Sequence, residues 1–389
     1  MSKHLFTGFA SNYSAKQIFR HTFASGSIKH SEALVSTLKK HYHANQALLY
    51  ATGRAALAAA IKATIPAGSK IAIPGLTCYA VHQAVLSADC IPIYLDISVT
   101  NYNSSTKEFL RTLSRHPDIN AVIVQNTLGL TINIAELEKI ASKRKIVIIE
   151  DLAHCAGAHY SDGREVGTVG DAIALSFGKG KSIDTVRGGA CLLHAKPLRP
   201  LLTPIELSKL SDRLRDRFYP LLGSKIRFLH HIKLGSAFSA FLFKFRFISR
   251  SADGPVELNK RLTHWQSALA LRQFQNLPKT AKLRATNAAK IIATLSLPPI
   301  PKGSAPLRVP ILTPDPDTTL ATLTKHHVHF DDIWYDTPVS PYRYYKQVKF
   351  PESICPNSVA ISEHLLNIPT HYPAVKLTPA LKILEKSLS

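Results

Sequence analysis

The sequence predicts an α/β fold built around a mixed, mainly parallel sheet. Short apolar segments alternate with helix-like segments between about residues 33 and 195, and a chain of 389 residues can bury a large core. Apolar residues make up 45% of the chain and charged residues 19%, which is the balance of a folded globular protein. Strands that are apolar throughout are typical of parallel sheets covered by helices on both faces.

The expected elements follow one another in a regular order. Helical patterns cover residues 31–42, 52–64, 79–87 and 134–143. Strand patterns cover residues 47–51, 70–74, 91–96, 121–125, 146–150, 172–176 and 189–194. We expect a large domain over residues 1–260, with an N-terminal arm and an insertion near 196–258. A smaller α+β domain over 261–389 would open with a helix at about 261–295, followed by proline-rich linkers around 298–310.

Ligands of such sheets bind at the carboxyl ends of the strands, so the residues after each strand are candidates for function. Gly53 precedes a predicted helix, whose free N–H groups and dipole favour a phosphate. Asp151 ends one strand, and Ser176 precedes the glycine-rich loop that contains Lys181. A phosphate cradle, an acid for a pyridine nitrogen and a lysine amine for an aldehyde are the parts of a pyridoxal-phosphate site.

The chain resembles the DegT/DnrJ/EryC1/StrS aminotransferases, which are fold-type-I pyridoxal-phosphate enzymes. The likeness covers nearly the whole chain, and its ordered spacing is more specific than any single motif. The family patterns appear as Thr52-Gly53-Arg54-Ala55-Ala56-Leu57, Pro74-Gly75-Leu76-Thr77-Cys78-Tyr79, Glu150-Asp151-Leu152-Ala153-His154, Val166-Gly167-Thr168-Val169-Gly170-Asp171, Lys181 with Gly188-Gly189, Asn259-Lys260-Arg261, Ala268-Leu269-Ala270-Leu271-Arg272-Gln273 and Ile368-Pro369-Thr370-His371-Tyr372-Pro373.

The resemblance implies a role for each matching residue. Lys181 would hold pyridoxal 5'-phosphate as a Schiff base and transfer the proton, while Asp151 would bind the pyridine nitrogen and His154 would lie against the ring. The phosphate would be held by Ser176, the turn at Gly53, the backbone N–H groups of Arg54 and Ala55, and, across a homodimer, Asn259. The implied reaction passes an amino group from a donor such as glutamate to a nucleotide-linked keto-sugar, in cell-surface polysaccharide or secondary-metabolite biosynthesis.

Some positions depart from the family pattern. Cys78 stands where a ring-stacking aromatic residue is usual, so Tyr79 is the candidate to replace it. Asn126 replaces the histidine of a second motif, and Arg187 replaces the usual acid before the double glycine. These changes leave the lysine chemistry intact but leave the acceptor, and the position aminated, open.

Other interpretations remain beside this one. From spacing alone, Lys179 and Lys181 could both be solvated lysines, Asp151 could cap a helix, and His154 could be a core histidine. A dehydratase of the same family is one alternative function, although such members characteristically carry histidine where Lys181 stands. A non-catalytic protein that binds nucleic acid or membranes is another; no nucleic-acid motif supports it.

Charge and cysteine usage bear on location and partners. The formal net charge of +22 attracts polyanions, and residues 224–250 hold six basic residues, no acidic ones and several phenylalanines. We expect helices at about 205–219 and 237–248, which either pack on the protein or lie on an anionic membrane. Five scattered cysteines, no signal-peptide pattern and no bilayer-length apolar run indicate a cytoplasmic protein, and the basic segment adds the option of a position peripheral to the inner face of the membrane. His326, His327 and His329 lack zinc-like companions, so no metal is expected.

Overall fold

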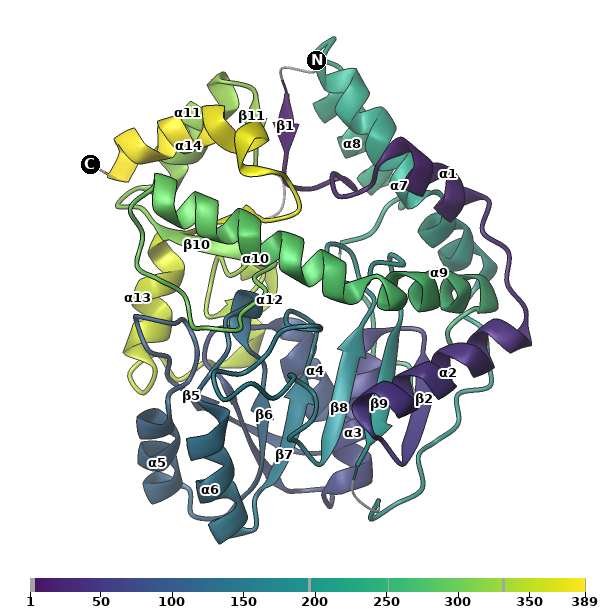
Figure 1. Cartoon of the computed structure of the whole chain (residues 1–389), viewed down its shortest axis with the longest axis vertical. Helices are drawn as coiled ribbons and strands as arrows, with labels where there is room; N and C mark the ends of the chain where they lie inside the picture. The colour runs from purple at the N-terminus through teal and green to yellow at the C-terminus, as the bar shows by residue number, and fades with distance from the viewer. Residues whose placement is uncertain (1–3, 195–196, 251, 331–332, 389) are drawn as a thin grey trace.

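The computed structural model describes residues 4–194, 197–250, 252–330 and 333–388. A seven-stranded sheet in the order β2-β9-β8-β7-β6-β3-β5 forms its centre (Figure 1). Strand β9 is antiparallel to both of its neighbours, and the other adjacent pairs are parallel, which confirms the predicted mixed, mainly parallel sheet. The strands are β2 (Gln46–Tyr50), β3 (Lys70–Pro74), β5 (Ile91–Leu95), β6 (Ile119–Val124), β7 (Val147–Asp151), β8 (Ala172–Ser176) and β9 (Gly189–Leu193).

Helices cover both faces of this sheet because successive strand side chains point to opposite sides. Ile71 and Ile73 of β3 join the core on one face, whereas Ala72 between them joins the core on the other. The first face is covered by α3 (Gly53–Thr64) and α4 (Tyr79–Ser87). The second face is covered by α2 (Ile28–Tyr42), α5 (Thr106–Arg115), α6 (Ile134–Arg144) and α9 (His264–Gln275). The result is a three-layer α/β/α arrangement.

The predicted elements of this region all form. Strands β3 and β8 and helix α4 have the predicted bounds, and the others differ by one to three residues at an end. Two helices were not predicted, α1 (Ala15–Thr22) and α5. The signal for α5 was present, because Ser105 caps its first turn and Phe109 and Leu113, four residues apart, face the core.

The C-terminal part builds a second apolar core. Strands β10 (Arg308–Leu312) and β13 (Leu365–Pro369) pair antiparallel, and α10 (Leu277–Thr294), α11 (Pro316–Lys325) and α14 (Ala374–Leu388) pack on them. The helix predicted at 261–295 is two helices, α9 and α10, because Pro278 starts a new helix after Asn276. The predicted linker at 298–310 ends inside β10.

Short elements connect the two parts. Strand β1 (Leu5–Phe6) pairs in parallel with β11 (Val328–His329), and β4 (Thr77–Cys78) pairs in parallel with β12 (Val339–Ser340). Helices α12 (Tyr342–Val348) and α13 (Pro356–His364) return the chain to the large sheet, where Val348 and Cys355 enter its core. Residues 339–355 therefore pack with the large sheet although they belong to the C-terminal third of the sequence.

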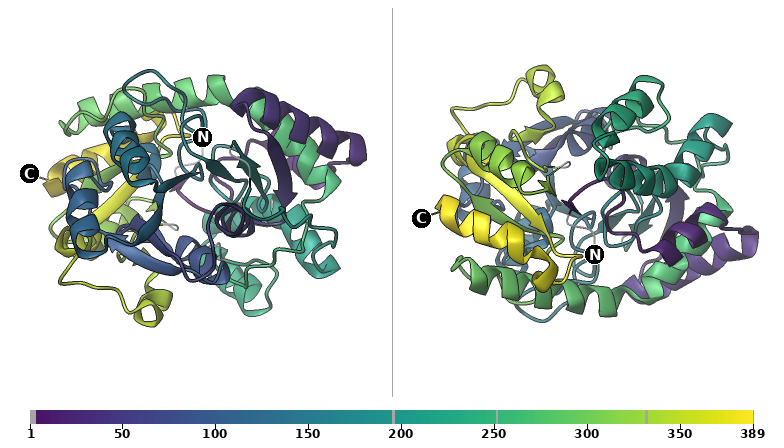
Figure 2. Two further views of the ribbon diagram at one scale, coloured as in Figure 1. Left: turned by 90° about the horizontal axis from the view of Figure 1, so that it is seen from below. Right: turned by 90° about the horizontal axis from the view of Figure 1, so that it is seen from above.

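The insertion forms a helical hairpin of α7 (Leu210–His230) and α8 (Gly235–Lys244). Figure 2 shows this hairpin on one side of the molecule and the C-terminal segment on the other. Helix α7 begins and ends later than predicted, and α8 is shifted two residues earlier at its start. Ile226, Leu242 and Ile248 form the buried centre of the hairpin. Among the described residues, no helix combines the length and the apolar character needed to span a bilayer.

The core predicts a stability difference between two neighbouring residues of α5. Phe109 is fully buried, whereas Leu110 is 46% exposed. Phe109→Ala should lower the free energy of unfolding by about 3–5 kcal/mol, because it removes a buried ring and leaves a cavity. Leu110→Ala is the matched control and should change it by less than about 0.5 kcal/mol. Chemical denaturation measures both values; equal losses would contradict the packing of α5.

Candidate active site

The candidate site lies at the carboxyl edge of the sheet. Strands β2, β7 and β8 run in the same direction, so Thr52 and Gly53, Asp151, and Ser176 all follow or end strands at this edge. The loop after β8 then carries Lys181. The sequence prediction that these residues share one edge agrees with this placement.

The first turn of α3 packs directly on the end of β8. A Cβ atom at Gly53 would lie 2.6 Å from Ser176 Oγ, so only glycine allows this approach. The side chain of Thr52 caps the helix by accepting a hydrogen bond from the Ala55 N–H, at 3.2 Å. In the structure this N–H donates to the cap, so its contact with a phosphate stays a prediction. The earlier amides of the turn, at Gly53 and Arg54, point along the helix axis toward the same edge.

The side chain of Arg54 turns away from this edge. Its guanidinium donates hydrogen bonds to the carbonyl oxygens of Ala252 (3.2 Å), Asp253 (2.8 Å) and Gly254 (2.6 Å). It also donates to Gln83 Oε1 at 2.7 Å. Burial lowers the pKa of this guanidinium. Arg54 thus anchors residues 252–254, at the end of the insertion.

Asp151 and Lys181 provide opposite charges at the site. The Asp151 carboxyl is buried and accepts a hydrogen bond from the Ala153 N–H at 3.0 Å. Burial raises the pKa of Asp151 to about 6, and the nearby charge of Lys181 acts in the opposite direction. A cation placed against Asp151 would therefore be strongly favoured, as would be expected for the acid that faces a protonated ring nitrogen.

The lysine loop is held by a second buried carboxylate, that of Asp184. It accepts hydrogen bonds from the Gly180 N–H (2.7 Å) and from the Val186 N–H (2.9 Å). Asn12 Nδ2 and the Tyr13 hydroxyl donate to it at 2.9 and 2.8 Å. Sequence reasoning missed Asp184 and Tyr13; the only signal was an acid three residues after Lys181.

Helix α9 fixes the same loop through two glutamine side chains. Gln273 Nε2 donates to the Asp184 carbonyl and Gln273 Oε1 accepts from the Asp184 N–H, each at 2.8 Å. Gln266 Nε2 donates to the carbonyls of Thr185 (3.3 Å) and Arg187 (3.2 Å). Gln273 ends the predicted alanine- and leucine-rich motif, whose glutamine therefore positions the loop backbone.

The two lysines of the loop point to different surroundings. Lys179 donates a hydrogen bond to the Ser249 carbonyl, and its ammonium lies 4.2 Å from the centre of the Tyr219 ring. The ammonium of Lys181 lies 4.2 Å from the centre of the Trp334 ring, among the side chains of the candidate site. This geometry favours Lys181 over Lys179.

His154 lies in the site as a buried, neutral side chain. The Leu128 N–H donates to His154 Nδ1 at 3.1 Å, and the Tyr335 hydroxyl lies 3.2 Å from the same nitrogen. Its ring stacks on Trp334 with centroids 4.9 Å apart. Burial, followed by the charges of Lys181 and Arg308, holds the pKa of His154 well below its usual range. Trp334 and Tyr335 were not predicted, because nothing local in the sequence links them to residues 180 positions earlier.

Within a single chain, two residues predicted to bind the cofactor, Tyr79 and Asn259, contact other parts of the protein. The Tyr79 ring stacks on Tyr344 of α12, with centroids 4.3 Å apart and planes 12° from parallel. Cys78 is close enough to the buried Tyr335 hydroxyl to raise its pKa further. Asn259 is exposed, and its carbonyl accepts a hydrogen bond from the Glu206 N–H at 3.0 Å. The roles of Tyr79 and Asn259 toward the cofactor stay predictions.

Two further motif acids hold the backbone beneath the site. Glu150 is fully buried and accepts from the N–H groups of Gly167 (2.8 Å), Val169 (2.9 Å) and Gly170 (2.7 Å), and from the Tyr160 hydroxyl. Asp171 Oδ2 accepts from the Ile148 N–H at 2.9 Å. These bonds fix the end of β7 relative to β8, and so place Asp151.

Metal binding has no candidate among the residues that the structure describes. No three His, Cys, Asp or Glu side chains in these ranges are arranged to hold an ion. His327 and His329 lie instead in a cluster of rings with His4, His230 and His231.

The sheet order, with an acid, a helix N-terminus and a lysine at one edge, defines the architecture of fold type I of the pyridoxal-phosphate-dependent enzymes. The DegT/DnrJ/EryC1/StrS aminotransferase family model matches residues 12–386, and the chain belongs to this family. Among solved structures, the Streptococcus pneumoniae protein Spr1654, described as a sugar aminotransferase and solved in its PLP form, has the same fold. Its TM-score is 0.69 at 14% identity, over 97% of this chain and 98% of that one.

Curated relatives match over shorter segments. GDP-perosamine synthase of Escherichia coli O157:H7 is 27% identical over 157 residues, which are 40% of this chain and 42% of the relative. The L-glutamine:2-deoxy-scyllo-inosose aminotransferase of Streptomyces kanamyceticus is 27% identical over 142 residues, which are 36% of this chain and 33% of the relative. The chain thus spans less than half the length of these relatives.

The raised pKa of Asp151 predicts a pH-dependent stability in the cofactor-free protein. Because the Asp151 carboxyl has a pKa of about 6 in the folded state, it keeps a proton there that it releases near pH 4 in the unfolded chain. This stabilises the folded state below about pH 4, and the stabilisation is lost as the pH rises through about 6. Asp151→Asn cannot titrate, so its stability relative to wild type should increase by about 2–3 kcal/mol between pH 4 and pH 7. Denaturation at a series of pH values tests this, and a difference that is constant with pH would refute it.

Proposed function

We propose that this chain is a pyridoxal-phosphate-dependent aminotransferase that passes an amino group from an amino acid, such as glutamate, to a keto-sugar. The observation that carries the proposal is the placement of Asp151, Lys181 and the N-terminus of α3 at one edge of the sheet. The residues fit this cofactor because an acid, an amine and a phosphate-binding helix end are available in one place. Family membership and the names of the relatives, one of which synthesises GDP-perosamine, support a sugar acceptor.

Each residue would have a defined task. Bound pyridoxal phosphate supplies an electron sink through which an amino group is exchanged between two substrates. Asp151 would stay ionised opposite the ring nitrogen, because a nearby cation lowers the pKa that burial raises. Lys181 Nζ would hold the cofactor and move a proton at the substrate carbon. Ser176 and the amides of Gly53 and Arg54 would bind the phosphate, and neutral His154 would orient the ring.

We also propose a homodimer in which Asn259 reaches the phosphate bound by a partner subunit. Its exposed position supports this, since it lies beside β2, where the Ala51 N–H donates to the Lys260 carbonyl at 2.8 Å. Tyr79, held by Tyr344, would border the site and contact the substrate or the partner. The acceptor would be nucleotide-linked, in cell-surface polysaccharide or secondary-metabolite biosynthesis in the cytoplasm.

Two alternatives make different predictions. A dehydratase of the family would release water from a sugar without consuming an amino donor. A non-catalytic basic protein would show no visible absorbance from a lysine-bound cofactor. The presence of Lys181 favours amino transfer. Its ammonium lies beside the Trp334 ring, whereas that of Lys179 lies beside the Tyr219 ring.

Replacing each lysine of the loop tests the proposed function. Lys181→Ala should lower amino transfer by at least about 100-fold and remove the cofactor absorbance, because no other amine of the loop is directed into the site. Lys179→Ala is the control and should keep measurable turnover. Borohydride reduction and peptide mapping should place the label on Lys181. A label on Lys179 would overturn the assignment.

The basic and aromatic composition of the exposed face of the α7–α8 hairpin supports binding of this face to an anionic membrane. Residues 217–252 contain seven Lys or Arg and no Asp or Glu. In the same segment Phe228 is 69% exposed, Phe245 56% and Phe247 52%, whereas Phe238 and Phe243 pack inside the hairpin. Exposed aromatic residues with basic neighbours match the headgroup region of an anionic bilayer. We therefore propose peripheral contact of this face with anionic lipid.

Vesicle binding tests this contact. The wild-type protein should sediment with phosphatidylserine-containing vesicles at low salt and dissociate as salt rises, because screening weakens each basic contact of about 1 kcal/mol. Phe241→Glu with Phe245→Glu should abolish sedimentation while the protein stays folded. Leu283→Glu on α10, where Leu283 is 49% exposed, is the control and should still sediment. Wild-type protein that stays in the supernatant at low salt would refute the membrane contact.

A further inference from the structure

Five histidine side chains meet at the end of the molecule where β1, β11 and the α7–α8 hairpin lie (Figure 1). They come from three separate parts of the chain: the residue before β1, the end of α7 with the residue after it, and β11 with the residue before it. Neighbouring ring centroids lie between 4.4 and 5.2 Å apart. We call this group the histidine cluster; its members are His4, His230, His231, His327 and His329.

The histidine cluster has a packed base and an open outer side. At the base, the ring of the buried Phe6 stacks on His329, with centroids 4.6 Å apart, and meets the edge of His230 at 5.1 Å. At the outer side, His231 and His327 are exposed. Contacts with the base therefore hold the rings together, while a ligand from solution can reach the outer members.

The surroundings of the cluster favour an anion. Burial, followed by the charges of neighbouring imidazoles, lowers the pKa of His329 to about 4, and the same two causes lower the pKa of His230. Among the described residues, no carboxylate acts on either of these two pKa values. The exposed side chains of Lys233, Lys325 and His326 lie next to cluster residues in the sequence and add positive charge. Each proton that the cluster takes up thus makes the next one less favourable, and a bound anion would offset this repulsion.

An anionic lipid combines the charge and the apolar character that this region fits. The cluster lies at the turn of the hairpin whose exposed face we propose to contact a membrane. Beside its two members in α7, Phe228 is 69% exposed, Ile232 56% and Leu234 55%. Apolar side chains of this kind enter the boundary between headgroups and acyl chains, and protonated imidazoles donate charge-assisted hydrogen bonds to phosphate oxygens. A soluble anion would leave the apolar residues unused.

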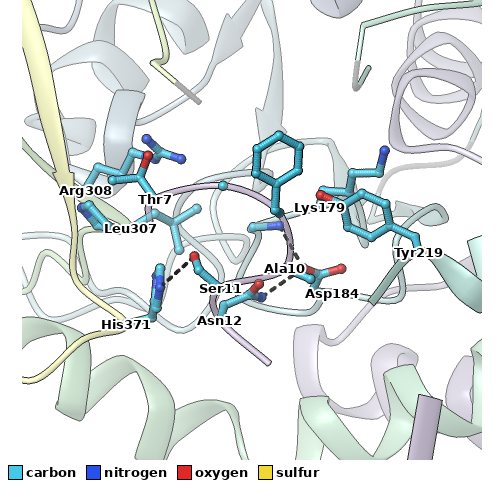
Figure 3. Close-up of a pocket in the computed structure, with 14 residues that line it drawn as sticks. Thr7, Ala10, Ser11, Asn12, Lys179, Asp184, Tyr219, Leu307, Arg308 and His371 are labelled. Carbon is cyan, nitrogen blue, oxygen red and sulfur yellow. Dashed lines mark hydrogen bonds between the residues drawn. The ribbon is translucent and has the colours of Figure 1, made fainter. Parts of the chain in front are cut away.

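The cluster is also joined to the candidate active site through the N-terminal segment. Strand β1 continues into residues 7–12, which line a cavity beside the lysine loop (Figure 3). There Ser11 Oγ lies 3.2 Å from His371 Nε2, and Asn12 donates to Asp184 at 2.9 Å. The histidine cluster therefore lies where the hairpin, the C-terminal part and the segment that contacts the lysine loop meet.

We propose that the histidine cluster binds the phosphate headgroup of an anionic lipid and takes up protons as the lipid binds. This inference rests on the proposed membrane contact of the hairpin and adds to it a headgroup site and a dependence on pH. Imidazoles gain positive charge as the pH falls, whereas a phosphodiester headgroup keeps one negative charge, so binding strengthens at lower pH. Lipid binding and proton uptake favour each other to the same extent, because their coupling is reciprocal.

Sedimentation of the full-length protein with vesicles of phosphatidylcholine and phosphatidylglycerol tests the proposal. The affinity of the wild-type protein should rise about 10-fold between pH 8 and pH 5.5. His231→Gln with His327→Gln makes the two exposed members neutral, and should remove most of this rise while leaving the affinity at pH 8 unchanged. His43→Gln with His116→Gln is the matched control, because it removes two histidines at the ends of α2 and α5, and should keep the full rise.

A second variant covers the case in which the glutamine variant fails to fold. His231→Lys with His327→Lys places fixed charges in the cluster, so binding at pH 8 should reach the wild-type affinity at pH 5.5. Binding at pH 8 that stays as weak as in wild type would refute the inference.

The outcomes separate the headgroup site from the membrane contact on which it rests. Wild-type protein that binds no phosphatidylglycerol vesicles at low salt would reject both. A pH-dependent rise that survives in the His231→Gln, His327→Gln variant, or that the control variant loses equally, would overturn only the headgroup site. Release of the protein at pH 5.5 by inorganic phosphate, but not by chloride at equal ionic strength, would show that free phosphate is the ligand and would overturn the lipid assignment.

Discussion

The carboxylate of Asp184 accepts hydrogen bonds from side chains of the N-terminal segment and from two amides of the lysine loop, while helix α9 holds its backbone. Three distant parts of the chain therefore meet at one buried charge. A buried carboxylate is stable only when its oxygens are satisfied, so the four donors must be present together. The conformation of the loop, and with it the direction of Lys181, depends on this single cluster of bonds.

A second constraint is the distribution of charge around the site. Asp151 is buried where a cation would stabilise it, whereas Arg284 and Arg308 are buried and would be stabilised by an anion. Burial raises the pKa of Asp151 and lowers the pKa of Arg284, so it works against both charges in a site without ligands. A cofactor ring and a carboxylate substrate together offer the opposite charges. The buried charges of the site are thus balanced only when ligands of opposite charge are bound.

Two arginines within the family motifs, Arg54 and Arg187, contact the insertion. Arg54, in the phosphate-binding turn, uses its side chain to fix residues 252–254 at the end of the insertion. Arg187, in place of the usual acid, lies 4.0 Å from Asp216 of α7, whose pKa burial raises to about 7. Both arginines therefore hold the insertion against the loops of the candidate site.

The sequence by itself determined the α/β class, the bounds of most strands and the residues at the carboxyl edge, because these follow from local apolar patterns and from motif spacing. It also singled out Asp151, Ser176 and Lys181. Only the tertiary structure decided that the Ala55 N–H serves the helix cap, that Lys179 lies beside Tyr219, and that Trp334, Tyr335 and Arg308 complete the surroundings of Lys181. The contacts of Trp334 with Lys181 and His154, and of Tyr335 with His154, join residues more than 150 positions apart, and no periodicity or local motif in a single sequence carries information about such pairs.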